Sequence, residues 1–139
     1  MTGKTFVDTN ILIYAHDSDA GKKYLKARNV VKSLWDDGSG TLSTQVLQEF
    51  YVTVRRKIKR PLTPAQARGI IESYLVWDVV QNSPSSILRA SEIEERYKLS
   101  FWDSLIICAA VEANANRILT EDLNDGQLIE GVRIVNPFR

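Results

Sequence analysis

The 139-residue sequence contains one cysteine and one histidine. A single cysteine cannot form an internal disulfide, and the apolar neighbours of Cys108 indicate a small buried hydrophobic residue. One histidine and one cysteine also supply too few nitrogen and sulfur ligands for a zinc site of the usual type. We expect His16 at a helix surface or in a turn.

Long apolar runs, repeats and low-complexity tracts are missing too. No stretch approaches the roughly 18 apolar residues that span a bilayer, so we expect no membrane association. The start, Met-Thr-Gly-Lys, lacks the charged, apolar and small-residue regions of a signal peptide. Together with the free cysteine, this favours a cytoplasmic location. Since no linker interrupts the chain, residues 1–139 are expected to form one domain.

Charge of one sign is not in excess either. The formal net charge is +1, which by itself predicts no polyanionic partner. Basic residues nevertheless gather in the run from Arg55 to Arg60, which follows a predicted helix. Arg55, Arg56 and Lys57 are therefore candidate nucleic-acid contacts. The alternative is a solvated run that is favoured at the helix C-terminus by the helix dipole.

Short apolar strands alternate with amphipathic helices along the chain. This alternation predicts a three-layer α/β/α domain with a mainly parallel central sheet of four or five short strands. In the helix over 84–97 we expect Ile87, Leu88, Ala90, Ser91 and Ile93 to face inward, and the nearly all-apolar helix over 100–114 should be central. The expected strands are 6–7, 41–43, 77–80, 117–119 and 132–135, and the other expected helices are 20–35, 44–58 and 63–74.

The first candidate site residue is Asp8, which follows the strand Phe6-Val7 and precedes the apolar run Ile11 to Tyr14. Ligands of α/β sheets bind where strands end and helices begin. The alternative is that Asp8 or Asn10 is a simple helix N-cap, a role that suits both residue types.

Three further acids have comparable positions. Glu49 lies at the border of the apolar stripe of its helix, where it can face a cleft or be exposed. Asp103 shares a helix face with apolar residues, and it also fits a Ser-x-x-Asp capping pattern with Ser100. Asp122 follows the strand that ends at Leu119, with Glu121 and Asp125 as second choices.

These four acids, if close together, would need a cation to offset their mutual repulsion. An all-oxygen ligand set suits Mg²⁺, with Mn²⁺ as a substitute, and such a site can activate water for displacement at phosphorus. Without a cation, the pKa of at least one acid should be raised.

Four segments of the sequence resemble the PIN-domain ribonucleases, and within them the VapC-type toxins of toxin–antitoxin pairs. The resemblance implies an Mg²⁺-dependent endoribonuclease that takes RNA as substrate, is inhibited by an antitoxin protein and forms a homodimer. It implies metal ligation by Asp8, Glu49, Asp103 and Asp122, with support from Asn10, Thr120 and, through water, Asp125. The segments are Phe6-Val7-Asp8-Thr9-Asn10-Ile11-Leu12, Gln45-Val46-Leu47-Gln48-Glu49-Phe50, Phe101-Trp102-Asp103-Ser104-Leu105-Ile106 and Leu119-Thr120-Glu121-Asp122-Leu123.

Other functions fit less well. The haloacid-dehalogenase phosphatases need a second aspartate at the position of Asn10, and a histidine-based ribonuclease needs more than His16. A PIN-related DNA nuclease would carry longer insertions for threading DNA. A catalytically silent scaffold that binds RNA or protein would not need all four acids.

Overall fold

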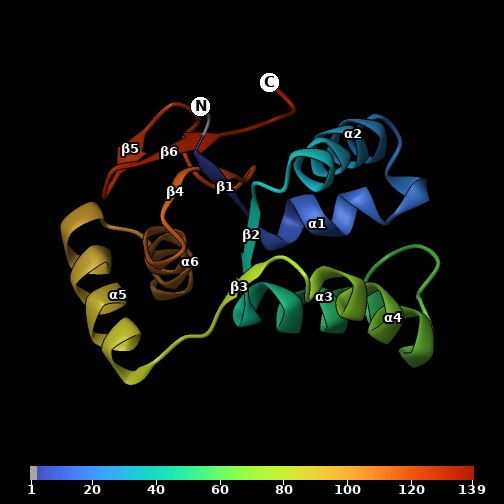
Figure 1. Ribbon diagram of the computed structural model, residues 1–139, viewed down its shortest axis with the longest axis horizontal. Coiled ribbons are helices and arrows are strands. Elements are labelled where there is room, and N and C mark those ends of the chain that lie inside the picture. The colour runs from blue at the N-terminus through green and yellow to red at the C-terminus, as the bar shows by residue number, and fades with distance from the viewer. Residues whose placement is uncertain (1–2) are drawn as a thin grey trace.

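The computed structural model describes residues 3–139, so Met1 and Thr2, on which the expectation about a signal peptide partly rests, lie outside the described residues. One sheet has the strand order β3-β2-β1-β4-β6-β5, and every neighbouring pair is parallel except β5 with β6 (Figure 1). This confirms the mainly parallel sheet. The strands are β1 (Lys4–Val7), β2 (Gly40–Ser43), β3 (Asp78–Val80), β4 (Ala115–Leu119), β5 (Leu128–Ile129) and β6 (Val132–Val135).

The sheet has six strands in the described residues, and the sequence predicted four or five. The additional strand is β5, which has only two residues and pairs Ile129 with Val132. Glu130 and Gly131 join β5 to β6 with positive φ values of 51° and 82°, as a two-residue hairpin turn requires. Glutamate rarely adopts this conformation, so the sequence signals the turn only through Gly131.

Helices cover both faces of the sheet, which confirms the three layers. Figure 1 shows α1 and α2 on one side and α6 and α5 on the other, while α3 and α4 pack as a pair beyond the end of β2. Within residues 3–139, no helix combines the length and apolar character needed to cross a membrane. The helices are α1 (Thr9–Ala15), α2 (Lys22–Asp37), α3 (Thr44–Arg56), α4 (Pro64–Tyr74), α5 (Pro84–Tyr97) and α6 (Phe101–Glu112), with a 3-10 turn at Ser18–Ala20.

The central position predicted for the last helix is confirmed, because residues 104–110 of α6 are all buried. Cys108 lies in this segment and is fully buried, as the sequence indicated. Its thiol approaches Glu112 Oε1 at 3.3 Å. Cys108 is therefore part of the core.

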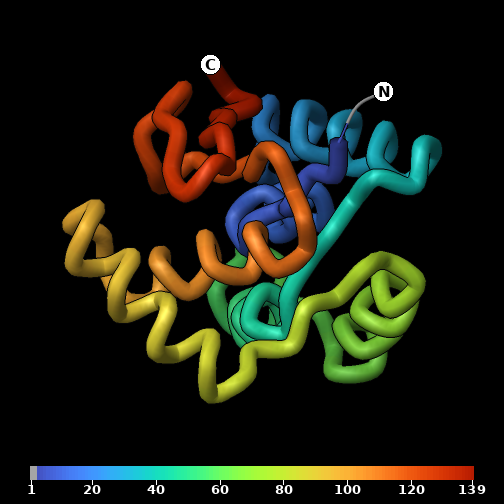
Figure 2. The backbone as a smooth tube through the Cα atoms, turned by 60° about the vertical axis from the view of Figure 1, so that its left-hand side comes forward, coloured from blue at the N-terminus to red at the C-terminus, as the bar shows by residue number. Residues whose placement is uncertain are grey.

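The inward face predicted for α5 is wrong in part. Ala90 and Ile93 are buried, but Ile87, Leu88 and Ser91 are exposed. Their place in the core is taken by Ser86, whose hydroxyl donates to Glu112 Oε1 at 2.7 Å. Because the buried Ser86 hydroxyl has a carboxylate acceptor, α5 packs on α6 through the face that carries Ser86, and Ile87 and Leu88 face away from the core. Figure 1 and Figure 2 both show α5 outside α6, with one side facing away from the molecule.

His16 lies in the turn after α1, one of the two positions that the sequence predicted, and its side chain is partly buried. His16 is the C-cap of α1, and its Nε2 lies 2.7 Å from the hydroxyl oxygen of Tyr74. Its ring packs edge-on against the rings of Phe50 and Tyr74. Burial lowers the pKa of His16, whose ring packs between α1, α3 and α4.

Gly40 and Gly69 are expected to respond oppositely to replacement by alanine. A Cβ at Gly40 in β2 would overlap the Trp77 ring, whereas one at Gly69 in α4 meets no atom within 4 Å. Gly40→Ala should therefore lower the free energy of unfolding by about 1–3 kcal/mol. Gly69→Ala should raise it by about 0.5–1 kcal/mol, because it removes helix-interior glycine. Urea denaturation measures both changes, and equal effects would contradict the close packing at Gly40.

Candidate active site

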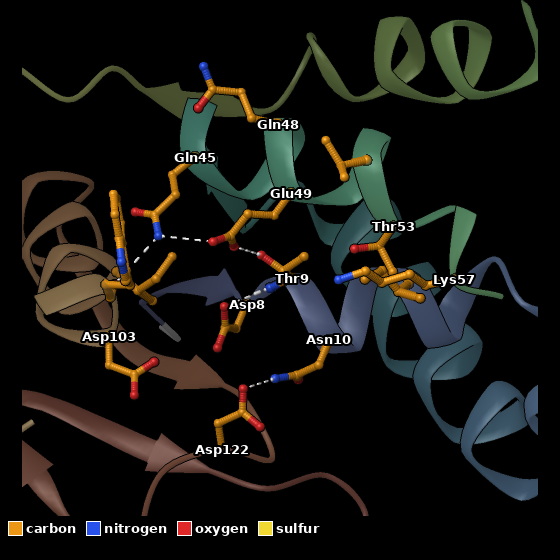
Figure 3. Close-up of a pocket in the computed structure, with 14 residues that line it drawn as sticks. Asp8, Thr9, Asn10, Gln45, Gln48, Glu49, Thr53, Lys57, Asp103 and Asp122 are labelled. Atoms are coloured by element: carbon orange, nitrogen blue, oxygen red, sulfur yellow. Dashed lines mark hydrogen bonds between the residues drawn. The ribbon is translucent and has the colours of Figure 1, made fainter. Parts of the chain in front are cut away.

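The carboxyl ends of β1, β2 and β4 lie side by side, because β1 pairs in parallel with both other strands. All four acids predicted for the site line one cavity at this edge, with a volume of about 560 Å³. Figure 3 shows Asp8 between Glu49 and Asp122, with Asp103 to one side. The structure thus brings together Asp8, Glu49, Asp103 and Asp122.

Asp8 is the most buried of these acids, with 6% of its surface exposed. It is the N-cap of α1, and its Oδ1 accepts a hydrogen bond from the Thr9 backbone N–H at 2.7 Å. Its Oδ2 accepts from the Thr120 hydroxyl at 2.8 Å. Burial raises the pKa of Asp8 to about 7, with smaller contributions from the charges of Asp122 and Glu49, while the two hydrogen bonds oppose the rise.

Glu49 is held by two residues to which the sequence assigned no role. The Thr9 hydroxyl donates to Glu49 Oε1 at 2.6 Å, and Gln45 Nε2 donates to Oε2 at 3.3 Å. Gln45 also bonds the Trp102 carbonyl at 3.5 Å, so it connects α3 to α6. The signal for Gln45 is its position four residues before Glu49, on the same helix face.

Asp103 has both of the roles that the sequence left open. Its backbone N–H donates to the Ser100 hydroxyl at 3.1 Å, which confirms the capping pattern at the start of α6. Its side chain lines the cavity. Partial burial raises the pKa of Asp103, and the charges of Asp122 and Glu49 raise it further. As with Asp8, burial outweighs the mutual repulsion that the sequence suggested as the cause.

Glu121 and Asp122 have separate roles in the structure. Glu121 accepts hydrogen bonds from the Tyr14 hydroxyl at 2.5 Å and from Lys23 Nζ at 2.7 Å. Asp122 lines the cavity, and its Oδ2 accepts from Asn10 Nδ2 at 2.8 Å. Asp122 is therefore the carboxylate that lines the cavity, while Glu121 bonds the loop after β4 to α1 and α2.

The three predicted supporting residues, Asn10, Thr120 and Asp125, have different positions relative to the cavity. Thr120 is buried and bonds both Asp8 and the Asp122 backbone N–H, so it joins β1 to the loop after β4. Asn10 lines the cavity beside Asp122. Asp125 instead accepts a hydrogen bond from the Asn136 backbone N–H at 2.8 Å and does not line the cavity. Its water-mediated role remains a prediction.

Within the basic run, only Lys57 lines the cavity. The Arg55 guanidinium donates to the Leu62 carbonyl at 3.2 Å and so stabilises the turn after α3. Arg56 is exposed and lies outside the cavity lining. Figure 3 shows Lys57 and Asp103 on opposite sides of Asp8.

The donor chemistry of the cavity fits a hard divalent cation, because every candidate ligand is an oxygen atom. The side chains are not gathered as a finished metal site: over residues 3–139, no three acids, histidines or cysteines lie close enough to hold one ion. Thr9, Thr120 and Asn10 donate to the carboxylates instead. Binding of one ion by three or more of these acids therefore requires their carboxylates to move closer together.

Comparisons with known proteins agree with this geometry. The family model for the PIN domain matches residues 5–124, and no curated protein matches the chain. A toxin–antitoxin complex from Klebsiella pneumoniae superposes with a TM-score of 0.71 at 19% identity, over 96% of this chain and 98% of that one.

Two further solved structures have similar folds. VapC20 from Mycobacterium tuberculosis, described as a sarcin–ricin loop cleaving toxin, has a TM-score of 0.63 at 19% identity, over 83% of this chain and 87% of that one. VapBC2 from Rickettsia felis, bound to a promoter DNA fragment, has a TM-score of 0.64 at 19% identity, over 94% and 96%. At this identity the likeness shows the fold. Since the PIN model matches residues 5–124 of 139, the chain belongs to the PIN domain family.

Proposed function

We propose that this protein is a divalent-metal-dependent endoribonuclease and the toxin of a toxin–antitoxin pair. The observation that carries the proposal is the arrangement of four acids, from four separate segments, around one cavity at the carboxyl ends of the strands. Membership of the PIN domain family and the description of VapC20 as a loop-cleaving toxin support it. Mg²⁺, or Mn²⁺ as a substitute, is the proposed cofactor.

Asp8, Glu49, Asp103 and Asp122 would hold the cation. When bound, it supplies Lewis-acid chemistry that lowers the pKa of a water and offsets charge at phosphorus. The chain itself fixes the carboxylates: Thr9 and Thr120 orient Asp8, and Asn10 orients Asp122. Because the pKa of Asp8 is raised to about 7, a part of the Asp8 carboxyl groups is protonated near neutral pH. A cation that binds Asp8 must therefore displace this proton.

An antitoxin is the proposed protein partner, supported by toxin–antitoxin complexes among the similar folds. A second, mainly apolar cavity of about 440 Å³ adjoins the acid cavity and shares Gln48 and Val52 with it. Leu47, Tyr51 and Ile71 line this cavity between α3 and α4. A partner segment seated there would lie next to the acid cavity. The homodimer stays a prediction, which the mass of the purified protein in solution tests.

Purified protein is expected to cut unstructured RNA internally with Mg²⁺ or Mn²⁺ and to stop when EDTA is added. Asp103→Asn and Asp122→Asn should lower the rate about 100-fold or more, because each removes a ligand charge. Glu92→Gln on the exposed face of α5 is the matched control and should cut as wild type does. Cleavage of DNA alone would identify a DNA nuclease, and RNA binding without cleavage would identify a silent scaffold.

A further inference from the structure

Trp102 is a large aromatic side chain at the cavity with no role in ligating a cation. It directly precedes Asp103 in the first turn of α6, lines the cavity and is 63% exposed. Its ring meets Phe101 edge-on, with centroids 5.4 Å apart and planes at 78°. Single exposed apolar residues are common on protein surfaces. Trp102 differs because it lies beside the proposed reaction centre.

Lys57 is the cation on the other side of the same cavity. Glu49, Thr53 and Lys57 follow one face of α3 at intervals of four residues, and all three line the cavity. Across residues 3–139 the Lys57 amine makes no ion pair or hydrogen bond, whereas Arg60 of the same run pairs with Asp19. Lys57 is thus the basic residue of the run that is free to meet an anion at the site.

We propose that Trp102 stacks on a base of the RNA strand and that Lys57 binds one of its backbone phosphates. The inference rests on the proposed ribonuclease function and adds two residues that contact the substrate outside the acids. An indole offers a π-face to any base, but bases within a duplex are already stacked and paired. Glu49 and Lys57 are about 12 Å apart along the helix, which corresponds to about three or four nucleotides of stacked strand. Figure 3 shows Lys57 on the opposite side of Asp8 from Asp103, the residue that follows Trp102 in the sequence.

The binding test uses Asp8→Asn as the background, so that RNA stays intact. Fluorescence anisotropy with a labelled single-stranded oligoribonucleotide should show that Trp102→Ala weakens binding about 5- to 100-fold. Trp102→Phe keeps an aromatic face and should recover most of the loss. With the same strand in a duplex, Trp102→Ala should change little. Leu88→Ala, an exposed apolar residue on α5, is the matched control.

Lys57→Gln should weaken binding and reduce the slope of log affinity against log salt by about 0.7, as expected for one lost phosphate contact on a single strand. Lys59→Gln removes an equal charge two residues away and should leave the slope nearly unchanged. In a series of oligoribonucleotides, an abasic nucleotide replaces each position of the strand in turn. At one position, the protein with Trp102 and the Trp102→Ala variant should bind with the same affinity. That position identifies the stacked base.

Unchanged affinity in Trp102→Ala, or an equal loss with single strand and duplex, would overturn the stacking contact. An unchanged salt slope in Lys57→Gln would overturn the phosphate contact. The ribonuclease proposal itself is tested separately, with the protein that retains Asp8. If that protein does not cleave RNA in the presence of Mg²⁺ or Mn²⁺, the ribonuclease proposal is wrong. Thermal melting of each variant shows whether a loss of binding reflects a loss of folded protein.

Discussion

Asp8→Asn is expected to abolish RNA cleavage and, at the same time, to raise the melting temperature of the metal-free protein at pH 8. The two effects have one cause, the ionised carboxylate of a residue that is 6% exposed. For cleavage, asparagine keeps the shape but removes the charge that a cation requires, so the rate should fall about 100-fold or more.

The stability effect follows from the raised pKa of Asp8. The folded-state pKa of about 7 exceeds the ordinary value of 3.8, so the folded chain holds this proton more tightly than the unfolded chain. The resulting stabilisation is complete below about pH 4 and disappears as the pH rises through 7. Asparagine cannot ionise and therefore avoids the loss. Its expected advantage at pH 8 is about 2–4 kcal/mol, or roughly 5–15 °C in melting temperature.

The hydrogen bonds of Asp8 make this substitution a fair comparison. Asn Oδ1 can still accept from the Thr9 backbone N–H, and its amide can donate to Thr120 Oγ1. Melting curves of wild type and Asp8→Asn, recorded in EDTA from pH 4 to 8, should diverge as the pH rises. Glu92→Gln should run parallel to wild type throughout. If Asp8→Asn melted below wild type at pH 8, burial of the charge would not be the source of the raised pKa.

The placement of the acids was largely predictable from strand and helix order. Asp8 comes immediately after an apolar strand, and Asp103 begins an unusually apolar helix, so each lies at a junction that parallel sheets gather at one edge. The sequence favoured Asp122 over Glu121, and Asp122 is the one that lines the cavity. What the sequence could not show is where Glu121 goes: its carboxylate bonds Tyr14 and Lys23, which are 107 and 98 positions away.

The packed face of α5 shows a second limit of sequence patterns. Ile87 and Leu88 are more apolar than Ser86, yet Ser86 is buried because Glu112 of α6 supplies its acceptor. A periodicity argument weighs side-chain polarity alone and has no information on the partner. Thr9 was missed for the same reason: its hydroxyl bonds Glu49, a contact that becomes visible only when α1 lies beside α3. Gln45, by contrast, is signalled by its position four residues before Glu49 on the same helix.

Mg²⁺ or Mn²⁺ is expected to stabilise the wild-type protein, and more so at pH 8 than at pH 6. A cation at 100 times its dissociation constant stabilises the folded state by about 2.7 kcal/mol, or about 5–10 °C in melting temperature. Asp8 must lose its proton before it binds a cation, and its pKa of about 7 lies between the two conditions. Affinity should therefore rise from pH 6 and level off by pH 8.

Proton release gives the sharper measurement of this competition. With a pKa of about 7, Asp8 should release about 0.9 proton per cation bound at pH 6 and about 0.1 at pH 8. Isothermal titration in two buffers of different ionisation enthalpy measures the number, at constant ionic strength so that screening does not contribute.

Asp122→Asn should lose most of the thermal stabilisation by the cation, because its carboxylate lies in the cavity beside Asn10. Glu121→Gln should keep it, because Glu121 bonds Tyr14 and Lys23 instead. A protein that gained no stability from either cation would contradict the proposed ligand set. Equal proton release at pH 6 and pH 8 would show that the cation binds without displacing a proton from Asp8, and the assignment of Asp8 as a ligand would then be wrong.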